Sequence, residues 1–163
     1  MSGSARTEPV ELEFRREDVT SDAAAALIGA LNAELSGLYP EDGANHFRLD
    51  SEEVAAGRGT FVVAYANGEA LACGAVRRLD PTTAEIKRMY VNPGVRGRGV
   101  GRRLLDTLEL EARRLGVRRL VLETGERQRR ALALYERAGF ARVPRFGEYV
   151  DSPLSVCMGK AIG

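Results

Sequence analysis

The chain has 163 residues, of which 44% are hydrophobic and 29% charged, and its formal net charge is +1. This is the size of one domain with a sizeable core, and the near-neutral charge argues against a strongly basic nucleic-acid binder. No stretch reaches the roughly 20 apolar residues of a membrane span, and the N-terminus lacks a signal-peptide core, so we expect a cytoplasmic protein without a membrane partner.

Residues 1–9 are small and polar, and we expect a flexible N-terminus followed by a single domain over residues 10–163. Apolar side chains alternate over residues 10–16, which predicts a first strand. An apolar stripe at helical spacing follows, and it predicts a helix capped by Thr20 or Ser21.

The next segment, residues 40–59, is irregular and holds the single histidine of the chain, His46. A lone histidine is more often a surface or packing residue than a catalyst. Asp50 and Glu53 are spaced as a helix N-cap and its reciprocal partner, which predicts a short helix here.

Two strand-like runs, residues 60–66 and 69–77, are separated by Asn67 and Gly68, a pair typical of a two-residue hairpin. A further turn leads into a third strand over residues 84–91. Cys73 lies in this region and Cys157 lies far from it. Neither has metal-ligand spacing, so we expect buried reduced thiols and no metal.

The third strand leads into a turn rich in glycine and arginine, and then into a helical pattern. The free N–H groups of a helix N-terminus, together with the close approach that glycine permits, form an anion site. The arginines around it indicate a di- or polyphosphate. A P-loop would need lysine where Val100 stands, and a dinucleotide fingerprint would need glycine or alanine in place of Arg102.

The last part of the chain alternates between strand and helix patterns. A strand over residues 117–123 is expected to run parallel to the third strand, because a helix crosses between them. Residues 128–138 form another helical pattern, and residues 140–143 and 154–158 supply the last strands.

The turn Arg96-Gly97-Arg98-Gly99-Val100-Gly101 resembles the Arg/Gln-x-x-Gly-x-Gly/Ala signature of the GNAT superfamily of N-acetyltransferases. The segment from Gln128 to Phe140 is similar to the second signature of that family, although Gln128 stands where asparagine is common. The resemblance implies an α/β fold with a mixed sheet of six or seven strands and flanking helices, and acetyl-coenzyme A as the cofactor.

The resemblance also implies which residues bind acetyl-coenzyme A, largely through backbone amides of a bulged strand and of the turn. The expected cofactor-binding residues are Met89, Tyr90, Val91, Arg96, Gly97, Arg98, Gly99, Val100, Gly101, Arg102, Gln128, Ala131 and Tyr135.

Acetyl transfer to an amine needs a base that removes the amine proton and an acid that protonates the departing thiolate. Tyr135 stands where the family places this acid, and a phenol with a reference pKa of about 10 can protonate a thiolate of pKa about 8.5. Glu85 stands where some members carry the base, unless it is a solvated strand residue paired with Lys87 or Arg88. Glu123 is the competing acid or base, and ordered water is a further alternative.

The resemblance implies transfer to the primary amine of a small molecule in a ternary complex. Protein or peptide N-acetylation and a non-catalytic acyl-coenzyme A sensor are the alternatives, and a homodimer is an open expectation. Glu148 belongs to a loop that could shape a pocket for a small cation. The candidate acceptor contacts are Tyr39, His46, Phe47, Glu123, Phe146 and Tyr149.

Overall fold

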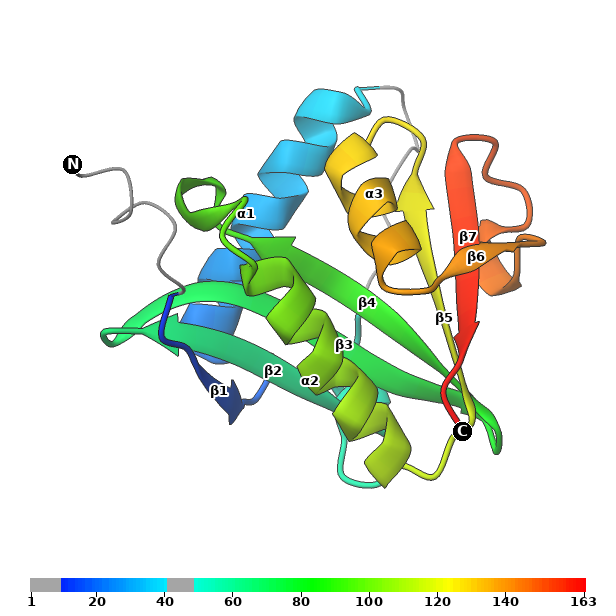
Figure 1. The fold of residues 1–163 in the computed structure, drawn as a ribbon, viewed down its shortest axis with the longest axis horizontal. Helices are drawn as coiled ribbons and strands as arrows, with labels where there is room; N and C mark the ends of the chain where they lie inside the picture. The colour runs from blue at the N-terminus through cyan, green and yellow to red at the C-terminus, as the bar shows by residue number, and fades with distance from the viewer. Residues whose placement is uncertain (1–9, 41–48) are drawn as a thin grey trace.

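A computed structural model describes residues 10–40 and 49–163 (Figure 1). Residues 1–9 and the predicted acceptor contacts His46 and Phe47 lie outside the described residues. The strands are β1 (Glu13–Arg16), β2 (Gly59–Ala66), β3 (Glu69–Asp80), β4 (Thr83–Val91), β5 (Arg119–Gly125), β6 (Ala141–Val143) and β7 (Ser155–Ala161). The α-helices are α1 (Asp22–Leu38), α2 (Val100–Arg114) and α3 (Arg129–Arg137), and the 3₁₀ turns are η2 (Ser51–Val54), η3 (Pro93–Val95) and η4 (Gly147–Tyr149).

The strands form one seven-stranded sheet in the order β1-β2-β3-β4-β5-β7-β6. Among the strand pairs of the described residues, β4 and β5 alone are parallel, which confirms the predicted mixed sheet and the predicted parallel pair. Two apolar clusters cover its faces. Val62 packs with the α2 side chains and Phe61 with those of α1, because successive residues of a strand point to opposite faces.

The parallel pair separates after a short contact. Residues 83–86 of β4 pair with residues 119–122 of β5, and beyond this point the two strands diverge, with α3 beside the gap (Figure 1). A bulge shifts the register of β3 against β4 between Cys73 and Ala75, and Arg88 within it has φ 55°. A non-glycine residue in this left-handed region is uncommon, so the bulge is a specific local feature of β4.

Several local signals are confirmed. Ser21 caps α1 by accepting a hydrogen bond from the Ala24 amide at 3.1 Å, and Asp50 and Glu53 form the predicted capping box of η2. The first strand is shorter than predicted: only Glu13–Arg16 pairs with β2, while Val10 and Leu12 pack against the apolar cluster under α2.

Cys73 and Cys157 are buried free thiols, as predicted. Within residues 10–40 and 49–163, no group of three or more His, Cys, Asp or Glu side chains is arranged to hold a metal ion. No helix in the same ranges combines the length and the apolar character that crossing a membrane requires.

Candidate active site

Two cavities lie where β4 and β5 diverge. The larger, of about 850 Å³, is lined by the glycine-rich turn and is called the turn cavity below. The smaller, of about 580 Å³, is lined by Glu123, Glu148 and Asp151 and is called the carboxylate cavity. Both cavities are lined by Met89 and Tyr135, so these side chains stand where the two spaces meet.

The start of α2 lines the turn cavity. Gly97 and Gly99 have φ of 80° and 81°, in the left-handed region that glycine adopts without steric cost. Gly99 is the N-cap of α2 and brings no side chain to the amides of the first turn. These amides and the positive end of the helix dipole therefore suit an anionic ligand.

The charge of the turn cavity points to the same kind of ligand. Its described lining contains six arginines and one carboxylate, that of Glu34. Arg96 is held in place because its Nε donates to the Val91 carbonyl at 2.9 Å and its Nη2 pairs with Glu34 at 2.6 Å. A dense arginine lining is suited to binding several phosphate groups.

Most of the residues predicted to bind a cofactor line the turn cavity, and two do not. Val100 is buried in the core with 1% of its side chain exposed, and Arg98 lies outside the lining. The residues that do line it are Met89, Tyr90, Val91, Arg96, Gly97, Gly99, Gly101, Arg102, Gln128, Ala131 and Tyr135.

Sequence reasoning missed four lining arginines that follow β5 or lie on α3. Three of them lie on α3, where the sequence pattern is that of a solvent-exposed helix face. The direction in which α3 packs places them at the cavity. These residues are Arg127, Arg129, Arg130 and Arg137.

The connection from β5 to α3 is fixed by close contacts with the end of α1. The Gln128 side chain accepts from the Gly125 amide at 2.9 Å, and the Tyr39 hydroxyl accepts from the Arg127 amide at 2.9 Å. A Cβ at Gly125 would lie 1.7 Å from the Tyr39 hydroxyl oxygen, so glycine is required there. Gln128, which departs from the common asparagine, thus shapes this turn through its own side chain.

Tyr135 is buried between the cavities, with 6% of the residue exposed. Its hydroxyl donates to Met89 Sδ at 3.8 Å, and its ring packs edge-on against Phe140. Burial, with a smaller contribution from the charge of Glu123, raises the pKa of Tyr135 well above that of an ordinary phenol. The hydroxyl is protonated near neutral pH, as an ordinary phenol is, and the raised pKa makes it a weaker acid.

Glu123 lines the carboxylate cavity from the end of β5. Burial raises its pKa to about 7, the Ser155 hydroxyl that donates to it at 2.6 Å opposes the rise, and the charges of Glu85 and Glu148 add to it. A carboxyl group with a pKa near neutrality can both accept and release a proton at physiological pH.

Thr124 and Tyr39 also line this cavity. The Thr124 hydroxyl is buried and has no hydrogen-bond partner among the described residues. Buried polar groups are usually satisfied, so this hydroxyl is a candidate contact for a bound molecule.

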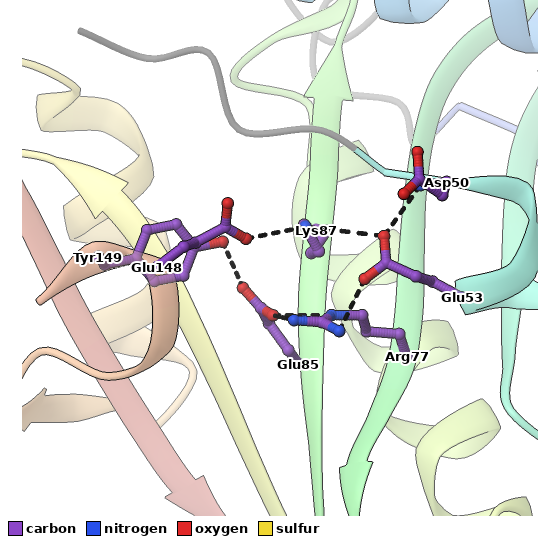
Figure 2. Close-up of polar contacts among 7 residues, drawn as sticks. All are labelled: Asp50, Glu53, Arg77, Glu85, Lys87, Glu148 and Tyr149. Carbon is purple, nitrogen blue, oxygen red and sulfur yellow. Dashed lines mark hydrogen bonds and ion pairs between the residues drawn. The ribbon is translucent and has the colours of Figure 1, made fainter. Parts of the chain in front are cut away.

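Glu85 lies behind the wall of the carboxylate cavity and is absent from the described lining of both cavities. It is fully buried, and its two oxygens are held by Arg77 and by the Tyr149 hydroxyl (Figure 2). Burial raises its pKa, against the opposing effects of Tyr149, Lys87 and Arg77. The sequence predicted Glu85 as a catalytic base with Glu123 as the alternative, and of these two only Glu123 belongs to the described lining of the cavity.

The loop before β7 contributes one of its two predicted aromatic contacts. Tyr149 lines the carboxylate cavity. Phe146 is not part of its described lining and packs edge-on against Tyr149, with ring centroids 5.3 Å apart.

Comparisons with known proteins find similarity to acetyltransferases. A family model described as the acetyltransferase (GNAT) family matches residues 25–140. The chain is 41% identical to the IAA acetyltransferase of Azospirillum brasilense over 148 residues, which cover 90% of this chain and 95% of that protein.

Solved structures share the fold. A protein from Klebsiella pneumoniae, described as an acyl-CoA N-acyltransferase, has a TM-score of 0.79 and is 32% identical in sequence. The match covers 93% of this chain and 98% of the Klebsiella chain. A GNAT family acetyltransferase from Elizabethkingia anophelis, solved with acetyl-CoA bound, has a TM-score of 0.68 at 19% identity and covers 93% of this chain and 98% of its own.

Proposed function

Because the chain belongs to the GNAT acetyltransferase family, we propose that it transfers the acetyl group of acetyl-coenzyme A to a primary amine of a small molecule. One observation carries this proposal. Tyr135 stands where an arginine-lined, glycine-rich cavity meets a cavity whose described lining holds three carboxylates and two cationic side chains, Lys87 and Arg88. An anionic donor and a cationic acceptor can thus approach the same point from two sides.

The turn cavity suits the donor, since acetyl-coenzyme A carries a pyrophosphate and a further phosphate. The amides at the start of α2 and the side chains of Arg96 and Arg102 would hold phosphate groups. The unpaired edge of β4 beyond Ile86 would lie along the pantetheine arm, because β5 has diverged from it there. The thioester supplies the activated acetyl group.

In our proposal Glu123 is the general base. A protonated alkylamine has a reference pKa of about 10.4 and cannot attack a thioester until it loses a proton. Glu123 lines the acceptor side, and its pKa of about 7 leaves a large fraction ionised at neutral pH. It takes the amine proton, and the nitrogen lone pair then attacks the acetyl carbonyl.

Tyr135 is the general acid in the same scheme. When the tetrahedral adduct collapses, the carbon–sulfur bond breaks and the sulfur takes a proton from the Tyr135 hydroxyl. Like an ordinary phenol, that hydroxyl is protonated near neutral pH. The protons balance because the ammonium nitrogen loses two of them: Glu123 takes the first before attack, and the second returns from the adduct to the Tyr135 oxygen, which has given its own proton to the sulfur. Glu123 then releases its proton to solvent.

The size of the carboxylate cavity supports a small acceptor. At about 580 Å³ it falls within the range typical of small-molecule sites. The name of the Azospirillum relative, an acetyltransferase, supports the reaction class.

The experiment that tests this function measures coenzyme A release from acetyl-coenzyme A with a panel of amino acids, polyamines, aminoglycosides, arylalkylamines and peptides. Direct binding of coenzyme A is measured by calorimetry alongside. Turnover of a small amine supports the proposal, and preference for peptides would move the assignment to protein acetylation. Tight coenzyme A binding without turnover of any amine would indicate a sensor instead of an enzyme.

A further inference from the structure

A set of polar side chains at the wall of the carboxylate cavity joins four elements, and the chain link between Glu148 and Tyr149 closes it into a ring (Figure 2). We call it the Glu85 ring. Its members are Glu53 of η2, Arg77 of β3, Glu85 and Lys87 of β4, and Glu148 and Tyr149 of η4.

The contacts of the Glu85 ring run from Tyr149 through Glu85, Arg77, Glu53 and Lys87 to Glu148. Arg77 bridges Glu53 at 2.7 Å and Glu85 at 3.0 Å, and the Tyr149 hydroxyl donates to the other oxygen of Glu85 at 2.6 Å. Lys87 contacts Glu148 at 3.4 Å and Glu53 at 4.0 Å. Since Glu148 and Tyr149 are neighbours in the chain, η4 is tied to β4 at two adjacent points.

The ring is buried where it holds η4. The Glu85 side chain is 0% exposed and that of Lys87 is 4% exposed, while Glu148 reaches solvent with 42%. Taking these charges out of water is costly, and their hydrogen bonds compensate only when the geometry is maintained. The arrangement therefore restricts η4 to one position, and Tyr149 and Glu148 line the cavity from there.

The Glu85 ring also faces Glu123. In the parallel pair Glu85 is the partner of Val121, so Glu85 and Glu123 point to the same face of the sheet. We propose that the ring is a positioning device: Glu85, through Tyr149, holds η4 as a wall of the carboxylate cavity, and places a second buried carboxylate beside Glu123. The inference rests on the proposed function only in treating Glu123 as the base.

Several other groups surround Glu123, and the titration of Glu85→Gln keeps all of them constant. Lys87, Glu148 and Tyr149 belong to the ring, and Arg88 and Asp151 line the same cavity. Outside the ring, the described residues also place Tyr39 at the end of α1, Tyr135 on α3 and Cys157, the strand partner of Glu123 on β7, near Glu123.

Two substitutions separate the two parts of the proposal. Tyr149→Phe removes one hydroxyl and leaves Glu85 charged, so it tests the hold on η4. Glu85→Gln keeps a polar group facing Tyr149 and removes the charge, so it tests the effect on Glu123. Tyr65→Phe is a matched control, because the Tyr65 hydroxyl also donates to a glutamate, Glu17, and Tyr65 is absent from the described lining of both cavities.

Amide hydrogen exchange of the unliganded protein tests the first part without any acceptor. Tyr149→Phe is expected to speed exchange in residues 147–155 by about tenfold and to leave α2 unchanged, whereas Tyr65→Phe leaves both unchanged. Equal exchange of residues 147–155 in Tyr149→Phe and in the control would overturn the positioning role.

Carbon NMR of the Glu123 side-chain carboxyl tests the second part. The wild-type titration midpoint is expected at about 7, and Glu85→Gln lowers it toward the ordinary range of a glutamate, because a neighbouring negative charge is gone. An unchanged midpoint would overturn this part. If Glu85→Gln does not fold, Glu85→Met, which also removes the charge, replaces it in the titration, and exchange in Tyr149→Phe still decides the first part.

Kinetics connect the ring to catalysis on whichever amine the wild type acetylates. Tyr149→Phe is expected to raise the KM for that amine by about tenfold with kcat and the KM for acetyl-coenzyme A little changed. A large loss of kcat with unchanged acceptor KM would contradict positioning. If no amine is acetylated, the proposed function fails, while the exchange and titration results still judge the ring.

Discussion

The two cavities are constructed differently, and the difference explains what each can do. The turn cavity takes its shape from backbone, namely two left-handed glycines, the first amides of α2, and a bulged strand whose edge is left open by β5, while arginine side chains supply its charge. The carboxylate cavity depends on side chains from β4, β5, η4 and the end of α1. Backbone features can hold a donor common to a whole family, whereas side chains determine which acceptor fits.

The largest expected effect concerns the carboxylate cavity. Glu123→Gln should lower kcat/KM for the amine by about 10²- to 10⁴-fold, because the proton acceptor is lost. In the wild type, kcat/KM should rise with pH through about 7, as Glu123 loses its proton and becomes able to accept one. The measurement is a pH–rate profile of both proteins. If Glu123→Gln keeps the same rise in kcat/KM with pH, the rise belongs to the titration of another group.

The next largest effect is on stability. Arg77→Leu leaves the buried carboxylate of Glu85 without its guanidinium and should lower the free energy of unfolding by about 3 kcal/mol at neutral pH. The loss should shrink at acidic pH, since protonated Glu85 no longer needs a cation. Urea denaturation at several pH values measures this, with Arg15→Leu, an exposed pair with Glu13, as the control that changes little.

A third prediction concerns the junction between the cavities. Gly125→Ala should lower the free energy of unfolding by about 1–3 kcal/mol, because the new methyl group displaces the Tyr39 ring. Gly29→Ala in α1 is the matched control: nothing lies within 4 Å of its Cβ, and it should stabilise the helix by up to about 1 kcal/mol. Thermal unfolding compares them, and equal melting temperatures would argue against the tight contact at Gly125.

The smallest effect distinguishes two arginines of the same turn. Arg102→Ala should weaken coenzyme A binding by about three- to tenfold, because Arg102 lines the turn cavity. Arg98→Ala should change it less, since Arg98 lies outside the described lining. Calorimetry with coenzyme A gives both constants, and a larger loss for Arg98 would show that the turn is arranged differently when the ligand is bound.

The same contrast shows how far the sequence could be interpreted. Local sequence signals predicted the helices and the hairpin, because residue spacing and turn residues determine structure within a few positions. The helix between the two strands predicted their parallel pairing. The Glu85 ring could not be predicted, because it joins residues that are far apart in the sequence. Glu85 contacts Arg77, 8 residues before it, and also Tyr149, 64 residues after it. A motif placed Glu85 near the chemistry, but only packing shows that its oxygens are already occupied and that Glu123 reaches the cavity.

The most direct test of the central claim is a comparison of coenzyme A release by the wild type and by Tyr135→Phe, with coenzyme A binding measured on both proteins. The account predicts that the variant binds coenzyme A within about threefold of the wild type and loses about 10²-fold or more in kcat, because only the proton donor between the two cavities is gone. Equal turnover by the two proteins would contradict the role of Tyr135 and, with it, the meeting of donor and acceptor at this point.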